Sequence, residues 1–96
     1  MRISLGFSHF DSLVTATGLG GGSLVGGIPI DAVFALIAVE TQDVRWRDDG
    51  VNPTPSVGTL MKVNTNNNYL IYQGPLSKFK MIAQTAGAKA TVSFYK

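Results

Sequence analysis

The sequence predicts an all-β protein: a single-domain, antiparallel β-sandwich of jelly-roll-like type with about eight short strands. Three observations support this prediction. Apolar and polar residues alternate with a period of two along most of the chain, as they do in strands with one buried face. Clusters of Gly, Asn and Pro separate the alternating segments. No helical periodicity persists beyond two turns, so nothing in the pattern competes with the strands.

The expected strands are short segments rich in β-branched and aromatic residues. They cover residues 2–7, 13–17, 32–40, 43–47, 59–63, 69–73, 78–84 and 90–95. The Asn-rich segment 64–68 lies between two of them and has the composition of a longer β-hairpin loop, because Asn tolerates left-handed backbone conformations. The whole chain, residues 1–96, is therefore expected to form one sandwich domain.

The clearest strand is the alternation of apolar and cationic residues that begins at Val44. A pleated strand places alternate side chains on opposite faces. We therefore expect Val44 and Trp46 to be buried and Arg45 and Arg47 to lie on a solvated face. A helix would not segregate these four residues in this way.

A turn is predicted directly after this strand, at Asp48, Asp49 and Gly50. Asp accepts turn geometry through its side chain, and Gly adopts positive φ without steric cost. We expect one of the two preceding arginines to form an ion pair with one of these carboxylates. At an exposed turn such a pair contributes at most about 1 kcal/mol.

Two long loops carry little charge and many small residues: a Gly-rich loop at 18–27 and a Pro/Asn loop at 50–58. Loops of this composition are costly to order alone, so we expect them to stay mobile in a monomer and to become ordered against neighbouring subunits. The residues expected at such an interface are Gly20, Gly21, Gly22, Leu24, Val25, Val51, Pro53, Pro55 and Val57.

The inventory of reactive side chains favours a protein that is not an enzyme. The 96 residues include no cysteine and a single histidine, His9, which is expected at the surface near the end of the first strand. Thiolate and histidine-rich metal sites are therefore excluded within one chain. The adjacent pair Asp48 and Asp49 belongs to a turn, whereas glycoside hydrolysis needs two carboxyls facing each other across a cleft. We expect no catalytic residues, no metal and no cofactor.

The charge pattern argues against a nucleic-acid or membrane partner. The formal net charge is +2, and the late lysines are interleaved with apolar residues rather than grouped in a basic run. The longest apolar run, residues 32–39, is much shorter than the roughly 20 residues of a membrane-spanning helix. The first nine residues lack the apolar core of a secretory signal, so we expect synthesis in the cytoplasm.

Several segments together resemble a group of small all-β virion structural proteins of tailed bacteriophages, the decoration or cement proteins. The resemblance is most specific in the element that runs from Val44 to Gly50, RWRDDG with its preceding valine. The other segments are residues 28–29, 35–40, 53–54, 57–58, 76–77, 79, 82, 85–88 and 92–95. They are spread over about two thirds of the chain, from residue 28 to residue 95, and the first 27 residues are outside the resemblance.

The resemblance implies a component of the virion, made in the cytoplasm of a host bacterium. The leading expectation is a capsid decoration or cement protein that binds the major capsid protein in many copies and stabilises the head through subunit contacts. The low charge and the small size agree with repetitive display. We also expect self-association into a symmetric homo-oligomer, with a trimer as the favoured form.

Three alternatives remain open at this stage. The first is a neck, tail or fibre-associated structural protein of the same virion. The second is a carbohydrate-binding β-sandwich that attaches the phage to host glycans through residues such as Trp46 or Tyr69. The third is a small barrel that binds single-stranded nucleic acid on a face of aromatics and lysines.

Overall fold

The computed structural model describes residues 3–64 and 68–96 of the chain. Within these ranges all regular structure is strand, apart from two short 3-10 helices. The strands are β1 (Ser4–Phe10), β2 (Thr17–Gly18), β3 (Phe34–Glu40), β4 (Val44–Arg47), β5 (Thr59–Met61), β6 (Tyr69–Tyr72), β7 (Lys80–Ala83) and β8 (Lys89–Tyr95). The 3-10 helices are η1 (Leu19–Gly21) and η2 (Leu76–Lys78). No helix among the described residues has the length and apolarity to cross a membrane.

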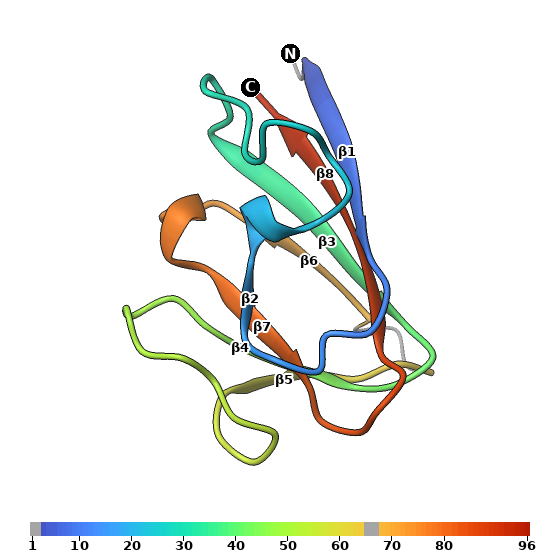
Figure 1. Ribbon diagram of the computed structural model, residues 1–96. Coiled ribbons are helices and arrows are strands. Elements are labelled where there is room, and N and C mark those ends of the chain that lie inside the picture. Colours follow the sequence, from blue (N-terminus) through green and yellow to red (C-terminus); the bar gives the residue numbers. More distant parts are fainter. Residues whose placement is uncertain (1–2, 65–67) are drawn as a thin grey trace.

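The strands form two four-stranded antiparallel sheets that pack on each other as a sandwich (Figure 1). One sheet has the order β1-β8-β3-β6, and the other has the order β2-β7-β4-β5. The pairs β1 with β8, β2 with β7, β3 with β6 and β4 with β5 are nested along the chain. Most consecutive strands lie in different sheets, so the chain crosses repeatedly between layers. This nesting is the topology of an eight-stranded jelly roll, and the predicted fold class is confirmed.

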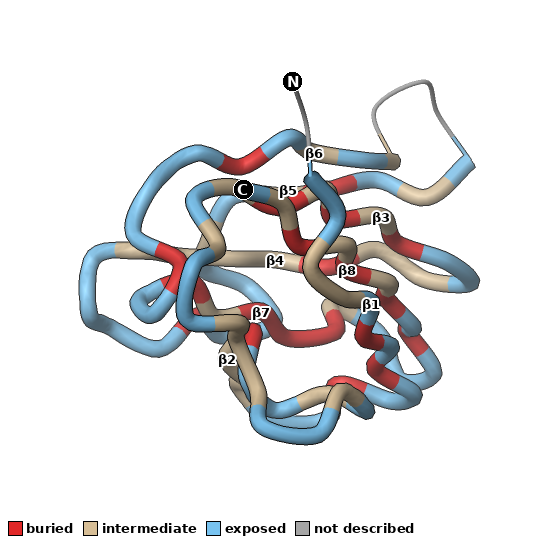
Figure 2. The backbone as a smooth tube through the Cα atoms, turned by 90° about the horizontal axis from the view of Figure 1, so that it is seen from above, coloured by how far each residue is buried: buried red, intermediate tan, exposed pale blue. Residues whose placement is uncertain are grey.

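The core lies between the two sheets and is filled by one side of each strand. On β3, every second residue is at most 1% exposed: Ala35, Ile37 and Val39. Val92 and Phe94 on the neighbouring β8 are likewise fully buried. The alternation of buried and less buried positions along these strands is visible in Figure 2. The period of two in the sequence therefore reflects the inner and outer sides of each sheet.

The strand expected at 13–17 is wrong, apart from its last residue. β1 instead continues to Phe10, and β2 consists of Thr17–Gly18 alone. Leu13 is buried but has a φ of 46°, and its carbonyl accepts a hydrogen bond from the backbone N–H of Ala83 (2.9 Å). An apolar residue held in an irregular segment thus produced the pattern of a strand.

The hairpin expected at 64–68 is also wrong, because the strands on either side of it belong to different sheets. β5 ends the order of one sheet and β6 ends the order of the other. Residues 65–67 themselves, and residue 2 of the first expected strand, lie outside the described residues. The only hairpin within a sheet in the described chain joins β4 to β5 across the Pro/Asn loop. Local composition identified a turn but not the sheet to which the chain returns.

Candidate interaction surface

The element from Val44 to Gly50 links β4 to the core, to β6 and to the loop that follows it. Val44 is fully buried, as predicted, while Trp46 is half-buried and packs against the edge of the core. The Trp46 indole stacks on Phe79 with ring centroids 4.9 Å apart, and the edge of Tyr72 approaches it at 5.8 Å. One face of the indole is thus occupied by Phe79. The prediction of full burial was too strong for Trp46, which packs against the outside of the buried cluster.

The two arginines of this element lie on the opposite side of β4, but both are half-buried instead of freely solvated. The Arg45 guanidinium donates to the carbonyl oxygens of Pro55 (3.1 Å) and Gly58 (2.9 Å). Arg47 donates from Nε to Oδ1 of Asp49 (3.0 Å), and Nη2 contacts the other carboxylate oxygen. The expected ion pair is confirmed. Arg45 instead anchors the loop that follows the turn.

The turn residues have separate roles. Asp48 accepts a hydrogen bond from the hydroxyl of Tyr72 (2.7 Å), which joins the end of β4 to β6 in the opposite sheet. Burial of Tyr72, together with this carboxylate, raises the pKa of the Tyr72 hydroxyl. Hydrogen bonds from Arg47 lower the pKa of the Asp49 carboxyl. Gly50 has a φ of +85°, as the turn prediction required.

The Gly-rich loop is docked on its own chain, in contrast to the expected mobility. It lies along the free edge of β1, where the Ser23 N–H donates to the carbonyl of His9 (3.0 Å) and the His9 N–H donates to Ser23 Oγ (3.0 Å). The N–H of Leu24 donates to Oγ of the buried Ser8 (3.2 Å). A Cβ added to Gly22 would overlap Ser8 Oγ and approach Phe10 Cζ to 2.8 Å. The glycine is therefore required for close approach, which the sequence pattern did not distinguish from flexibility.

The Pro/Asn loop is likewise ordered within the chain. Thr54 and Val57 exchange backbone hydrogen bonds of 2.9 and 3.2 Å, which close a tight turn at the loop tip. Pro53 is buried against Gly58, and the Lys80 ammonium donates to Oδ1 of Asn52 (3.0 Å). These contacts and the two bonds from Arg45 fold the loop back against the sheet.

The nine predicted interface residues do not form a single surface. The Gly-rich and Pro/Asn loops lie far apart in Figure 1, one beside η1 and the other beyond the ends of β4 and β5. Leu24 is half-buried against the core, and Pro53 is buried. Exposed residues remain in each loop: Gly20, Gly21 and Val25 in the first, and Val51, Pro55 and Val57 in the second. The half-buried Gly22 completes the set.

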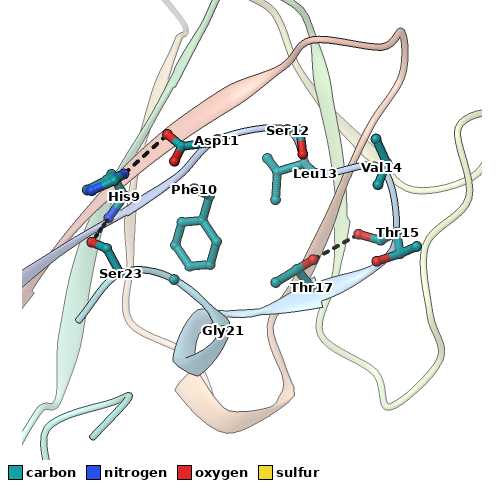
Figure 3. A pocket seen from close by; sticks show the side chains of 11 residues that line it. His9, Phe10, Asp11, Ser12, Leu13, Val14, Thr15, Thr17, Gly21 and Ser23 are labelled. Carbon is teal, nitrogen blue, oxygen red and sulfur yellow. Dashed lines mark hydrogen bonds and ion pairs between the residues drawn. The ribbon is translucent and has the colours of Figure 1, made fainter. Parts of the chain in front are cut away.

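A shallow groove of about 300 Å³ lies between the end of β1, the following irregular segment and η1 (Figure 3). It brings together a serine, a histidine and an aspartate, the residue types of a hydrolytic triad. The ring nitrogen Nδ1 of His9 lies 3.2 Å from Oδ1 of Asp11, at a point where both side chains are more than half exposed. Ser23, however, bonds to the backbone N–H of His9 and not to its ring.

This geometry does not activate a nucleophile. In a triad the imidazole bonds to the hydroxyl that attacks and is oriented by a carboxylate on its other nitrogen. Among the described residues, the only hydrogen-bonding partner of the His9 ring is Asp11. The described residues also contain no cluster of three or more His, Asp or Glu side chains that could hold a metal ion. On one side the groove is lined by Gly21, Gly22 and Ser23 of the docked Gly-rich loop.

The outer face of the β1-β8-β3-β6 sheet is the most unusual surface of the molecule. We call this surface the outer apolar face. It comprises the outward side chains of Phe7, Phe34, Leu36, Ala38, Tyr69, Ile71, Thr91, Ser93 and Tyr95. The side chains that face outward in sandwiches usually alternate as polar residues, whereas here Phe7, Tyr69 and Ile71 are 54%, 55% and 46% exposed.

The strand register aligns these side chains in rows across all four strands. Phe7 is opposite Ser93, Ser93 is opposite Leu36, and Leu36 is opposite Ile71. In the next row towards the C-terminal ends of β1 and β3, Ala38 pairs with Tyr69. On the other side, Phe34 stacks on Tyr95 with ring centroids 5.1 Å apart. A continuous row of this kind gives a flat surface suited to another protein surface.

Within the described strands of this sheet, the Asp, Glu, Lys and Arg residues lie at one end of the outer apolar face. At that end Glu40 on β3 lies opposite Lys89 on β8, and the two side chains have opposite charges. His9 lies at the edge, on β1. The centre of the face therefore carries no charge to keep an apolar partner away.

The sequence did contain a signal for this surface. In β3, residues 34, 36 and 38 are apolar as well as residues 35, 37 and 39. A strand that is apolar on both faces is covered on both sides or leaves one apolar face open. The β1-β8-β3-β6 sheet of this sandwich has only one covered face. The pattern indicated a buried strand, and only the layer arrangement showed which face is left open.

Comparison with known proteins adds no further assignment. The chain matches no family model, no curated protein and no solved structure.

Proposed function

We propose that this chain is a structural protein of a tailed-bacteriophage virion, and that it acts as a capsid decoration protein. In this role it binds the major capsid protein and stabilises the head by adding contacts between coat subunits. It performs no catalysis and acts through its surface alone. The observation that carries the proposal is the outer apolar face, which a small and weakly charged domain presents to a partner.

The energetic argument concerns the exposed aromatic and aliphatic groups of that face. Burial of apolar surface stabilises association by roughly 25 cal/mol per Å². Phe7 and Tyr69 each leave about half of their surface in water, which corresponds to about 100 Å² per ring. One copy would therefore gain only modest affinity. Repetition on a lattice of coat subunits multiplies such contacts, as a decoration protein requires.

The jelly-roll topology supports the proposal as an analogy only. Jelly rolls recur in viral capsid domains and also in lectin domains, and a fold does not decide between functions. A glycan-binding role at Trp46 would have one face of the indole for a sugar ring, because Phe79 occupies the other. The resemblance that centres on residues 44–50 favours the virion role.

A binding experiment tests this proposal. Heads purified from a phage mutant that lacks the protein are mixed with purified chain, and bound copies are measured after sedimentation. We expect saturation in proportion to the number of coat subunits. The variant Phe7→Glu places a charge on the outer apolar face, at the β1 edge, and should reduce binding at least tenfold, or about 1.4 kcal/mol.

The matched control is Ile30→Glu, which makes the same kind of change at a residue that is 99% exposed and lies outside the strands. It should bind like the parent. Equal binding by the parent and Phe7→Glu would contradict the role of the face. Saturation at a few copies per particle would assign the chain to the neck or tail.

A further inference from the structure

Among the described residues, the free edge of β6 is the least protected sheet edge. β6 ends the order of its sheet, so one side of its backbone has no strand partner. Its residues, Tyr69, Leu70, Ile71 and Tyr72, include no charge, no proline and no register shift. Natural proteins use charged residues, proline and β-bulges to protect an edge strand against pairing, and β6 has none of the three. Figure 2 shows β6 at the periphery of the sandwich, alternating between exposed and less exposed residues.

The other three edges are protected or very short. The edge of β1 is covered by the Gly-rich loop, whose Ser23 bonds to His9. β2 has two residues and β5 has three, so each offers a shorter ladder than the four residues of β6. An extended segment would therefore find its best pairing site at β6.

The register shows which backbone groups point away from β3. Val39 donates its N–H to the carbonyl of Asn68 (2.9 Å), so this opposed pair is a hydrogen-bonded one. In antiparallel ladders, hydrogen-bonded and non-hydrogen-bonded pairs alternate. Leu70, opposite Ile37, is then bonded to β3, whereas the N–H and C=O groups of Tyr69 and Ile71 point to the open edge.

We propose that a second copy of this chain pairs with that edge, β6 against β6 in antiparallel orientation about a two-fold axis at Leu70. This register places Tyr69 of one copy opposite Ile71 of the other, twice by symmetry. Each pair exchanges two N–H to C=O bonds, since both residues direct these groups outward. Each pair also brings an aromatic side chain beside a β-branched one, a favourable cross-strand combination. The edge is thus complementary to itself, as a two-fold interface requires.

The dimer would enlarge the outer apolar face. A two-fold axis perpendicular to the sheet keeps both outer faces on the same side, so two four-stranded sheets become one eight-stranded sheet. This arrangement differs from the trimer expected from the loops. Two linked faces would bind a lattice of coat subunits more tightly than one face. This benefit of the dimer rests on the proposed function. The dimer itself is independent of that function and is tested without particles.

The experiment measures the mass of the purified chain in solution by sedimentation velocity over a range of concentrations. We expect a dimer at about 100 μM, where a contact of micromolar affinity is filled. The variant Ile71→Pro removes a donor that β3 does not use, and proline is tolerated at the open side of an edge strand. It should be monomeric with an unchanged far-UV circular dichroism spectrum.

A second variant guards against misfolding of the proline variant. Tyr69→Lys/Ile71→Lys changes exposed side chains only and places lysine opposite lysine in both pairs, where like charges repel. We expect its dimer dissociation constant to rise at least tenfold, or about 1.4 kcal/mol. The control Val25→Lys/Ile30→Lys adds the same charge at residues that are 96% and 99% exposed, and it should remain dimeric.

Amide hydrogen exchange provides a signature of the register. The amides of Tyr69 and Ile71 should gain protection as concentration rises, because the pairing bonds them. A parent chain that is monomeric at the highest concentration would overturn the proposal. So would a double-lysine variant that dimerises like the parent. Protection that arises only when another protein is added would assign the edge to a different partner and would also overturn it. Loss of head binding by an intact dimer would instead count against the proposed function.

Discussion

Docking of the Gly-rich loop on β1 leads to a sharp prediction for Gly22. Its φ of −89° is open to any residue, so Gly22→Ala introduces no backbone strain. The added Cβ would, however, overlap Ser8 Oγ and lie 2.8 Å from Phe10 Cζ and 2.9 Å from the His9 carbonyl oxygen. The loop must move away from β1 to make room for it.

The cost follows from two terms. Overpacking by one methyl group costs about 1–3 kcal/mol. Displacement of the loop also weakens the bond from the Leu24 N–H to Ser8 Oγ, a loss of about 0.5–1.5 kcal/mol. We therefore expect Gly22→Ala to lower the free energy of unfolding by about 2–4 kcal/mol. In a domain of this size the Tm should fall by at least about 8 °C.

Urea denaturation measures this change, and Gly20→Ala is its matched control two residues away. At Gly20 the nearest heavy atoms to an added Cβ are 3.8 Å distant, an ordinary contact. The free energy of unfolding of Gly20→Ala should equal that of the parent or exceed it by up to about 1 kcal/mol, because alanine restricts the unfolded chain. If Gly22→Ala were as stable as Gly20→Ala, the loop would not be docked on β1 in solution, and the reasoning would fail.

Three further predictions concern the aromatic cluster and its surroundings. Trp46→Ala should lower the unfolding free energy by about 2–4 kcal/mol, somewhat below the cost of a fully buried ring; thermal melting within a few degrees of the parent would contradict this. Tyr72→Phe removes the bond to Asp48 and should cost about 1–2 kcal/mol at neutral pH. Because the pKa of Tyr72 is raised in the folded state, its stabilisation is complete below the unfolded value of about 10 and is lost as pH rises further. The difference between the parent and Tyr72→Phe, measured by urea denaturation, should shrink above about pH 10, and a constant difference would refute the assignment. Arg45→Ala frees two carbonyls of the Pro/Asn loop and should accelerate cleavage of residues 50–58 by proteinase K; unchanged cleavage would count against the anchor.

The sequence was most informative where burial follows strand periodicity. The alternation at Val44 and Trp46 predicted correctly which side of β4 faces the core, and the turn at Gly50 was located from its chemistry. The segment around Leu13 was misread because an apolar residue is buried there by an irregular backbone with positive φ. Periodicity alone does not separate a short strand from such a segment.

The candidate surface was harder to predict because it depends on contacts between distant segments. Glycines at 20 and 22 look alike in sequence, yet only the second lies against Ser8 and Phe10. Composition therefore suggested a mobile loop where close packing requires glycine. Ile71 is exposed because its side chain lies on the uncovered outer face of the sheet, on the last strand. Both features follow from the nested pairing and not from local pattern.

The most direct test of the proposed role is the copy number of this chain in purified virions, measured by quantitative mass spectrometry against the major capsid protein. A decoration protein should be present in a fixed ratio to the coat subunits and should be lost from the particle without loss of the tail. We expect that ratio to be of the same order as the number of coat subunits. Absence from the virion, or a few copies that purify with the tail, would contradict the proposed role.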